Sequence, residues 1–195
     1  MIDATALDRH VEKLFDVMQR VHAALTKAGI EYRIVGGMAV YLHVSEQGHD
    51  AGRFTKDVDI AVNRGDIQRI FEAAEGFGFR YRHVAGGDML VDAREPKARS
   101  AVHLVFALEK VRPDYLEPVP DFAGPVVAKQ GLLIAPVADL VRMKLTSLRL
   151  KDKVHIIDMD GVGLITPEIE TSLSEPLRRR LQLVREEERQ STGAE

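Results

Sequence analysis

Residues 53–62, Arg-Phe-Thr-Lys-Asp-Val-Asp-Ile-Ala-Val, constrain the fold of this chain more than any other stretch. Val58 and Ile60 alternate with polar residues, as on a strand with one buried face. Side chains at i and i+2 of a strand point the same way, so Asp57 and Asp59 share the opposite face within about 7 Å of each other. Each carboxylate then makes ionisation of the other less favourable. A solvated strand face can also carry two aspartates without a function, so the neighbouring segments must decide between these readings.

The composition describes an ordinary globular protein of one domain, or one domain with a helical extension. The chain has 195 residues, of which 45% are hydrophobic and 29% charged. A net charge of −3 argues against a global positive field of the kind that binds nucleic acid. The absence of cysteine excludes disulfides and thiolate metal sites. No apolar run approaches the roughly 20 residues of a membrane span, and the charged, periodic N-terminus is not a signal peptide, so we expect a cytoplasmic protein with no membrane partner.

Periodicity and turn residues predict a small mixed sheet flanked by helices, with more helices toward the C-terminus. We therefore expect an α+β (mixed-sheet α/β) fold, with residues 1–135 as the sheet-containing core and 136–195 as a helical region packed on it. The predicted helices span 5–28, 66–76 and 136–150, a short one follows Gly37, and a last one starts at 166–168. The predicted strands span 32–35, 58–62, 79–84, 89–92, 101–107 and 131–134, with a hairpin turn at 86–88 and loops at 44–52 and 112–125.

The glycine pair Gly36-Gly37 stands between a predicted strand and a predicted helix. Glycines allow a phosphate to approach main-chain N–H groups, and a helix N-terminus adds a favourable dipole. The pair alone is more typical of a plain tight turn. Followed by the strand of Asp57 and Asp59, however, it predicts a phosphate-binding turn beside a divalent-metal site. A cation between the two aspartates would relieve their repulsion.

The segment Gly36–His43 (GGMAVYLH) followed by Arg53–Ile60 (RFTKDVDI) resembles the nucleotidyltransferase superfamily of the DNA polymerase β type. Within it the chain is most similar to the minimal, AbiEii-like branch, which includes toxin nucleotidyltransferases. The resemblance runs from about Tyr32 to about Asp158. It implies transfer of a nucleoside monophosphate from a nucleoside triphosphate (NTP) to a hydroxyl acceptor, such as a tRNA end, a protein side chain or a small molecule. It also implies Mg²⁺ or Mn²⁺ as cofactor and, for a toxin, an antitoxin as partner.

The same resemblance assigns expected roles to individual residues. Asp57 and Asp59 would be catalytic metal ligands, Gly36 and Gly37 would contact the triphosphate, and Arg53 and Thr55 would flank the metal site. Lys144 matches a helical lysine that reaches the triphosphate in the family, although a solvated lysine on an amphipathic helix is the alternative. The group Arg149, Lys151 and Lys153 fits an RNA-facing patch or, more simply, a charged helix end.

The chain departs from the family pattern at the third carboxylate, where the predicted strand 101–107 carries His103. A histidine there remains a metal ligand and a base, but it removes one negative charge, which favours a metal that tolerates nitrogen ligands, such as Mn²⁺. His103 could equally be a strand residue without a role, with Asp88 or Asp92 supplying the acid. Intact glycines and aspartates favour an active enzyme, whereas His103, together with Met38 after the glycine pair, favours a degenerate member that binds nucleotide or a partner without chemistry.

Overall fold

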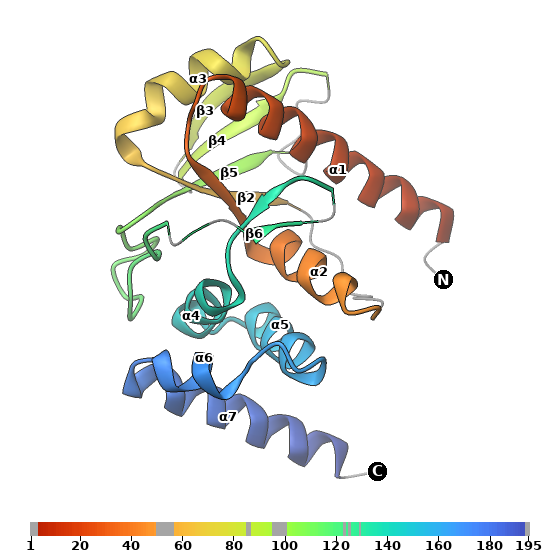
Figure 1. Cartoon of the computed structure of the whole chain (residues 1–195), viewed down its shortest axis with the longest axis vertical. Helices are drawn as coiled ribbons and strands as arrows, with labels where there is room; N and C mark the ends of the chain where they lie inside the picture. Colours follow the sequence, from red (N-terminus) through yellow and green to blue (C-terminus); the bar gives the residue numbers. More distant parts are fainter. Residues whose placement is uncertain are drawn as a thin grey trace.

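The computed structural model describes residues 4–49, 57–84, 87–94, 101–122, 124, 126–128 and 130–193, with the backbone alone for residues 4–10. These residues form one seven-stranded mixed sheet and seven α-helices, which confirms the predicted α+β class (Figure 1). The strands are β1 (Tyr32–Val35), β2 (Val58–Val62), β3 (Phe79–Val84), β4 (Gly87–Asp92), β5 (Val102–Phe106), β6 (Val126–Val127) and β7 (Leu133–Ile134). The helices are α1 (Ala4–Lys27), α2 (Gly36–Glu46), α3 (Ile67–Glu75), α4 (Val137–Ser147), α5 (Leu150–Gly161), α6 (Pro167–Ser172) and α7 (Glu175–Thr192), with a 3₁₀ turn at Arg64–Asp66.

The sheet has the strand order β3-β4-β5-β2-β1-β7-β6, which puts β5, β2 and β1 at its centre. Strand β2 runs parallel to β5 and antiparallel to β1, and Asp59 lies opposite His103 on one side and Val35 on the other. Directly opposed residues of neighbouring strands share a face, so these three side chains project from the same side of the sheet. Val58 and Ile60, at 1% and 0% exposure, face the other way into the core, as their alternation predicts.

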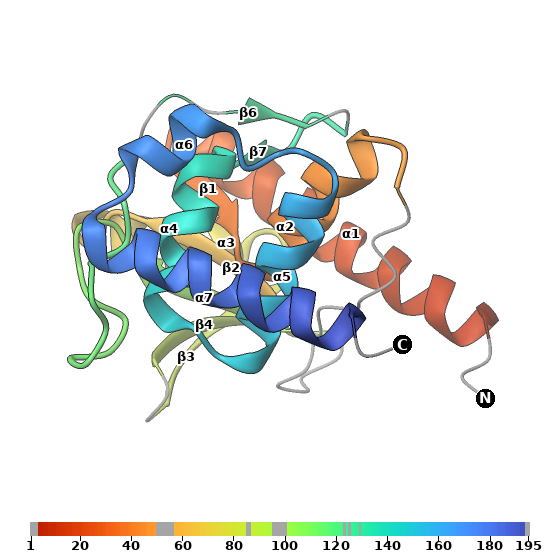
Figure 2. The same ribbon diagram turned by 90° about the horizontal axis from the view of Figure 1, so that it is seen from below.

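Helices cover the sheet in two groups. Figure 1 shows α1 and α3 at one end of the sheet and α4 to α7 gathered below it, with α7 outermost. Seen from below, α7 crosses in front of α4 and α5 (Figure 2). Leu177 and Leu181 of α7 are completely buried, so this helix closes the core on that side. None of the helices in the described ranges combines the length and the apolar character that a membrane crossing needs.

The helix predicted for residues 136–150 is interrupted in the structure. Helix α4 ends at Ser147, Leu148 takes a left-handed backbone conformation with φ 46°, and α5 begins at Leu150. The residues from 146 to 153 contain no glycine or proline, so nothing in the local sequence predicts the break. The side chain of Asp152 accepts a hydrogen bond from the Arg149 backbone N–H at 3.2 Å, which stabilises the start of α5.

One other boundary differs from the sequence prediction, and one predicted hairpin is confirmed. Helix α2 continues to Glu46, three residues into the predicted loop 44–52, and the part of that loop beyond His49 lies outside the described residues. The hairpin predicted at 86–88 is confirmed by the antiparallel pairing of Val84 with Gly87.

Candidate active site

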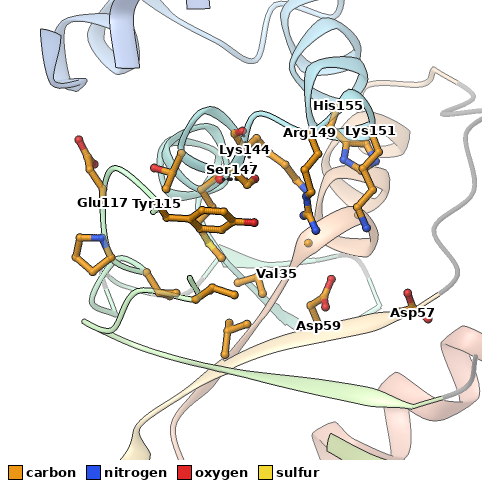
Figure 3. Close-up of a pocket in the computed structure, with 18 residues that line it drawn as sticks. Val35, Asp57, Asp59, Tyr115, Glu117, Lys144, Ser147, Arg149, Lys151 and His155 are labelled. Atoms are coloured by element: carbon orange, nitrogen blue, oxygen red, sulfur yellow. Dashed lines mark hydrogen bonds between the residues drawn. The ribbon is translucent and has the colours of Figure 1, made fainter. Parts of the chain in front are cut away.

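A pocket of about 380 Å³ lies between the sheet and the junction of α4 and α5 (Figure 3). Asp57, Asp59 and Val105 form its floor on the central strands. The two glycines at the start of α2 lie beside them, residues of α4 and α5 form the roof, and the loop after β5 forms a third wall. The pocket therefore joins segments from most of the chain length.

The floor holds Asp59 against the start of α2. Gly36 has φ 70°, and a Cβ added to it would lie 2.1 Å from Asp59 Oδ2, so only a residue without a side chain fits there. Val35, the N-cap of α2, makes no side-chain hydrogen bond to the free N–H groups of the first turn. An uncapped helix N-terminus presents N–H donors and a positive dipole end to an anion.

The burial of Asp59 in the pocket shifts the pKa of its carboxyl group. Burial raises the pKa of this carboxyl, and the negative charge of Asp57 adds to the increase. Electrostatic interactions with Lys144, His103 and Lys151 act in the opposite direction and lower the pKa of Asp59. The fold therefore tolerates two acids side by side because cationic groups from the opposite wall surround the deeper one.

Three cationic side chains face the aspartates from the roof: Lys144 of α4, Arg149 at the helix break and Lys151 of α5. Figure 3 shows Arg149 and Lys151 extending toward β2, where Asp57 and Asp59 project upward. Lys144 is only 5% exposed, and its burial lowers the pKa of its ammonium group. The arrangement of cations opposite carboxylates suits a ligand that carries phosphates together with a metal ion.

The third wall is the loop between β5 and β6, which contributes Val111, Tyr115, Glu117 and Pro118. Two backbone hydrogen bonds close this loop: Val119 N–H donates to the Glu109 carbonyl, and Leu108 N–H donates to the Val119 carbonyl. Ser174, the N-cap of α7, donates a hydrogen bond to Glu117. Tyr115 points into the pocket from this wall, as Figure 3 shows. Aromatic rings are stacking surfaces for nucleobases, so this end of the pocket suits the base of a nucleotide.

Two polar atoms of the roof lack a hydrogen-bond partner among the described residues, Thr146 Oγ1 and His155 Nδ1. Both residues line the pocket. Burial and the nearby charge of Lys144 lower the pKa of His155 to about 4. His155 is therefore neutral at physiological pH, and its buried Nδ1 atom has no hydrogen-bond partner among the described residues.

The neutral state of His155 predicts a specific pH dependence of folding stability. An unfolded histidine titrates near 6.5, so between about pH 6.5 and 4 the unfolded chain binds more protons, and stability falls as pH falls. We expect His155→Gln to lose about 2 kcal/mol less stability than the wild type between pH 7.5 and pH 4.5, measured by urea unfolding. His49→Gln, an exposed site, should behave like the wild type. Equal losses in wild type and His155→Gln would contradict the assignment.

The structure brings together most of the residues that the sequence singled out. Gly36, Gly37, Asp57, Asp59 and Lys144 all line the pocket. His103 lies next to Asp59 on the same face of the sheet, although it does not line the pocket itself. Arg53 and Thr55, predicted to flank the metal site, lie outside the described residues.

The structure also shows where Asp88 and Asp92, the alternative third acids, lie relative to the pocket. Asp88 accepts hydrogen bonds from Tyr81 and His83, and Asp92 pairs with Arg20 of α1, so both carboxylates have partners away from the pocket. Among the residues that the structure describes, no three His, Cys, Asp or Glu side chains lie close enough together to hold a metal ion by themselves. The role of Asp57, Asp59 and His103 as metal ligands therefore stays a prediction.

Sequence reasoning missed some residues of the pocket and anticipated others only in part. Arg149 and Lys151 face the ligand space, whereas Lys153 pairs with Glu187 of α7 at 2.7 Å, so the predicted cationic group is divided. Tyr115 lies in a proline-bounded loop, and ordered loops commonly carry binding residues, which was the available signal. His155 gave no signal, because its position depends on the helix break at Leu148.

Comparisons with known proteins yield weak similarities only. No family model and no curated protein sequence matches the chain. A solution structure of the antibiotic-resistance factor ANT(2″)-Ia has a TM-score of 0.49 and 11% sequence identity, covering 95% of this chain and 95% of that chain. A crystal structure of ANT(2″)-Ia in complex with adenylyl-2″-tobramycin has a TM-score of 0.46 and 14% identity, covering 87% of this chain and 95% of that chain. Similarity at this level does not assign a reaction or a substrate to the chain.

Proposed function

We propose that this protein is a metal-dependent nucleotidyltransferase that moves a nucleoside monophosphate from an NTP to a hydroxyl acceptor. The observation that supports this proposal is the arrangement of charges in one pocket. Asp57 and Asp59 lie on one side of it and three cations on the other: Lys144, Arg149 and Lys151. The uncapped N-terminus of α2 lies beside the aspartates. Carboxylates alone would repel a triphosphate, and cations alone would bind any anion. The combination favours a ligand that brings both phosphates and a divalent cation.

Different residues of the pocket would have different roles in such a reaction. The three cations and the N–H groups at Gly36-Gly37 bind and orient the triphosphate, and Tyr115 supports the base. Asp57 and Asp59 fit Mg²⁺ or Mn²⁺, because Mg²⁺ is commonly held by one or two carboxylates together with substrate phosphates. When bound, the metal ion supplies charge stabilisation to the phosphoryl oxygens.

The covalent step exchanges one bond at the α-phosphorus. The acceptor oxygen forms a bond to this phosphorus, the bond to the bridging oxygen breaks, and pyrophosphate leaves with the bonding electrons. The acceptor hydroxyl loses its proton, and the imidazole of His103, opposite Asp59 in the sheet, is the proposed acceptor of that proton. Cations at the roof stabilise the charge on the departing pyrophosphate.

Incubation with α-³²P-labelled ATP, CTP, GTP or UTP tests the proposal and identifies the acceptor. Each NTP is supplied with Mg²⁺ or Mn²⁺ and with one of three acceptor pools: bulk tRNA, soluble protein, or small hydroxyl-bearing molecules. We expect label in one pool, dependent on divalent metal. Label in tRNA or protein would also support the toxin-type role and justify a search for an antitoxin. No label in any pool, at millimolar NTP, would leave the chain without the proposed activity.

A second function, nucleotide binding without chemistry, is favoured by His103 at the position of the third acid. The two functions differ in what substitutions of this residue do. In an active enzyme, His103→Ala should slow transfer by about 10²–10⁴-fold, because general-base assistance is lost. In a degenerate protein, His103→Asp should create metal-dependent transfer that the wild type lacks, because it restores an acid next to Asp59.

Rates of transfer in both metals separate these outcomes. In an active enzyme His103→Asp should also shift the preference from Mn²⁺ toward Mg²⁺, since an oxygen ligand replaces nitrogen. His83→Ala is the control, because His83 lies on the edge strand β3 and pairs with Asp88. If neither substitution of His103 changes rate or metal preference, this residue has no role in the reaction.

A further inference from the structure

Asp152 is a buried carboxylate that does not line the pocket but contacts three residues that do. Its side chain is completely buried, with 0% exposure. Oδ1 accepts a hydrogen bond from Lys144 Nζ at 3.1 Å, and Oδ2 accepts from Ser147 Oγ at 2.7 Å and from Arg149 Nε at 2.7 Å. One carboxylate thus connects the last turn of α4 with the first residue after the helix break.

The position of Asp152 explains how two cations can reach the ligand space from a broken helix. Left-handed backbone at Leu148 separates Ser147 from Arg149, and the backbone N–H of Arg149 also donates to Asp152 Oδ2. The shared acceptor therefore adds polar contacts across a junction where Leu148 has a left-handed backbone conformation. Arg180 of α7 donates to the carbonyl oxygens of Leu145 and Thr146, both at 2.8 Å, and so fixes the end of α4 from the opposite side.

Asp152 also affects the protonation of Lys144 through its negative charge. Burial lowers the pKa of Lys144, while the negative charges of Asp152 and Asp59 raise it, and Arg149 lowers it further. The neutral His155 and the cation Lys151 complete the ionisable groups of this wall. Of the two acids, only Asp152 is hydrogen-bonded to Lys144, so it makes the largest contribution to keeping the ammonium group charged.

We propose that Asp152 is a positioning residue that holds Lys144 and Arg149 in the orientation needed to bind the triphosphate. The inference rests on the proposed function, because the ligand it prepares for is an NTP. Because Lys144 and Arg149 donate hydrogen bonds to the same carboxylate, the position of each cation depends on Asp152. Removing the carboxylate should therefore weaken phosphate binding although Asp152 itself touches no ligand.

Asp152→Asn tests this role, because it keeps the shape of the side chain and removes the charge. We expect the Kd for inorganic tripolyphosphate and for NTP at pH 7.5 to rise by about tenfold or more, since charge-assisted hydrogen bonds orient both cations. The affinity for a nucleoside without phosphates should be unchanged. Isothermal titration calorimetry at pH 7.5 measures both effects.

Asp160→Asn is the matched control. Asp160 lies on the same helix and accepts two hydrogen bonds from Arg185, both at 2.8 Å, but it does not line or support the pocket. If Asp152 only stabilised the fold, both variants would have a lower melting temperature and both would bind tripolyphosphate as tightly as the wild type. That result would overturn the positioning role.

Titration of Lys144 gives a readout that needs no ligand. The ¹³Cε resonance of labelled lysine reports its protonation, and Lys144→Arg identifies the signal. We expect the pKa of Lys144 to fall in Asp152→Asn and to remain nearer the wild-type value in Asp152→Glu, which keeps the charge. If Asp152→Asn does not fold, Asp152→Glu decides: its longer side chain should displace the cations and weaken tripolyphosphate binding, and wild-type affinity would overturn the role.

The outcomes separate this inference from the proposed function. A wild type that binds neither NTP nor tripolyphosphate overturns both. A wild type that binds them, together with an Asp152→Asn variant of equal affinity and unchanged Lys144 titration, overturns the positioning role and leaves the proposed function in place.

Discussion

Replacing Asp57 and Asp59 together with asparagine should lower the rate of nucleotidyl transfer by at least about 10³-fold, because the divalent cation loses both carboxylates. Asparagine keeps the size of each side chain, so the pocket keeps its shape. The measurement is the initial rate with the preferred NTP and acceptor at saturating Mg²⁺. Asp66→Asn is the control, since Asp66 follows β2 closely but pairs with Arg69 outside the pocket.

The same double variant should fold at least as stably as the wild type. Burial raises the pKa of Asp59, which means that the folded protein holds its charged form at a cost in free energy. A neutral asparagine removes this cost, so the melting temperature without ligand should stay equal or rise. A loss of activity with a gain of stability is typical of residues kept for function. Transfer within about tenfold of wild type in a folded double variant would contradict the assignment of these aspartates.

Gly36→Ala should be the most damaging single substitution at the glycine turn. The added Cβ would lie 2.1 Å from Asp59 Oδ2, and alanine is also disfavoured at φ 70°. Either α2 or Asp59 must move, so we expect transfer to be abolished and the free energy of unfolding to fall by about 3 kcal/mol or more. Chemical denaturation and the transfer assay measure the two effects.

Gly48→Ala separates backbone strain from the clash. Gly48 follows the other end of α2, has φ 79°, and has nothing within 4 Å of the added Cβ. It should lose only about 1 kcal/mol of stability and keep its activity. If Gly36→Ala is no worse than Gly48→Ala in both assays, the close contact between Gly36 and Asp59 has no functional importance.

The floor of the pocket could be predicted from the sequence because it depends on local periodicity. Alternation in β2 sets which side of the strand each aspartate faces, and it required no knowledge of tertiary contacts. The strand of His103 followed the same rule, and the structure places this residue opposite Asp59. The roles of these residues remain predictions, but their common face follows from period-two geometry alone.

Apart from Lys144, the roof could not be predicted because it depends on a break that local sequence does not encode. Residues 144–153 have good helix formers and no glycine or proline, so propensity favours one continuous helix. The structure instead places Leu148 in a left-handed conformation, stabilised around the buried carboxylate of Asp152. Tertiary hydrogen bonds override propensity here, and they turn Arg149, Lys151 and His155 toward the pocket.

The most direct test of the central claim is calorimetric titration of the wild type and the Asp57→Asn/Asp59→Asn variant with each NTP, with and without Mg²⁺ or Mn²⁺. We expect the wild type to bind at least one NTP with a Kd below about 1 mM, and more tightly when a divalent metal is present. In the variant the metal should no longer improve binding, while the cations of the roof still hold the triphosphate weakly. Absence of NTP binding by the wild type, or equal metal dependence in wild type and variant, would contradict the claim.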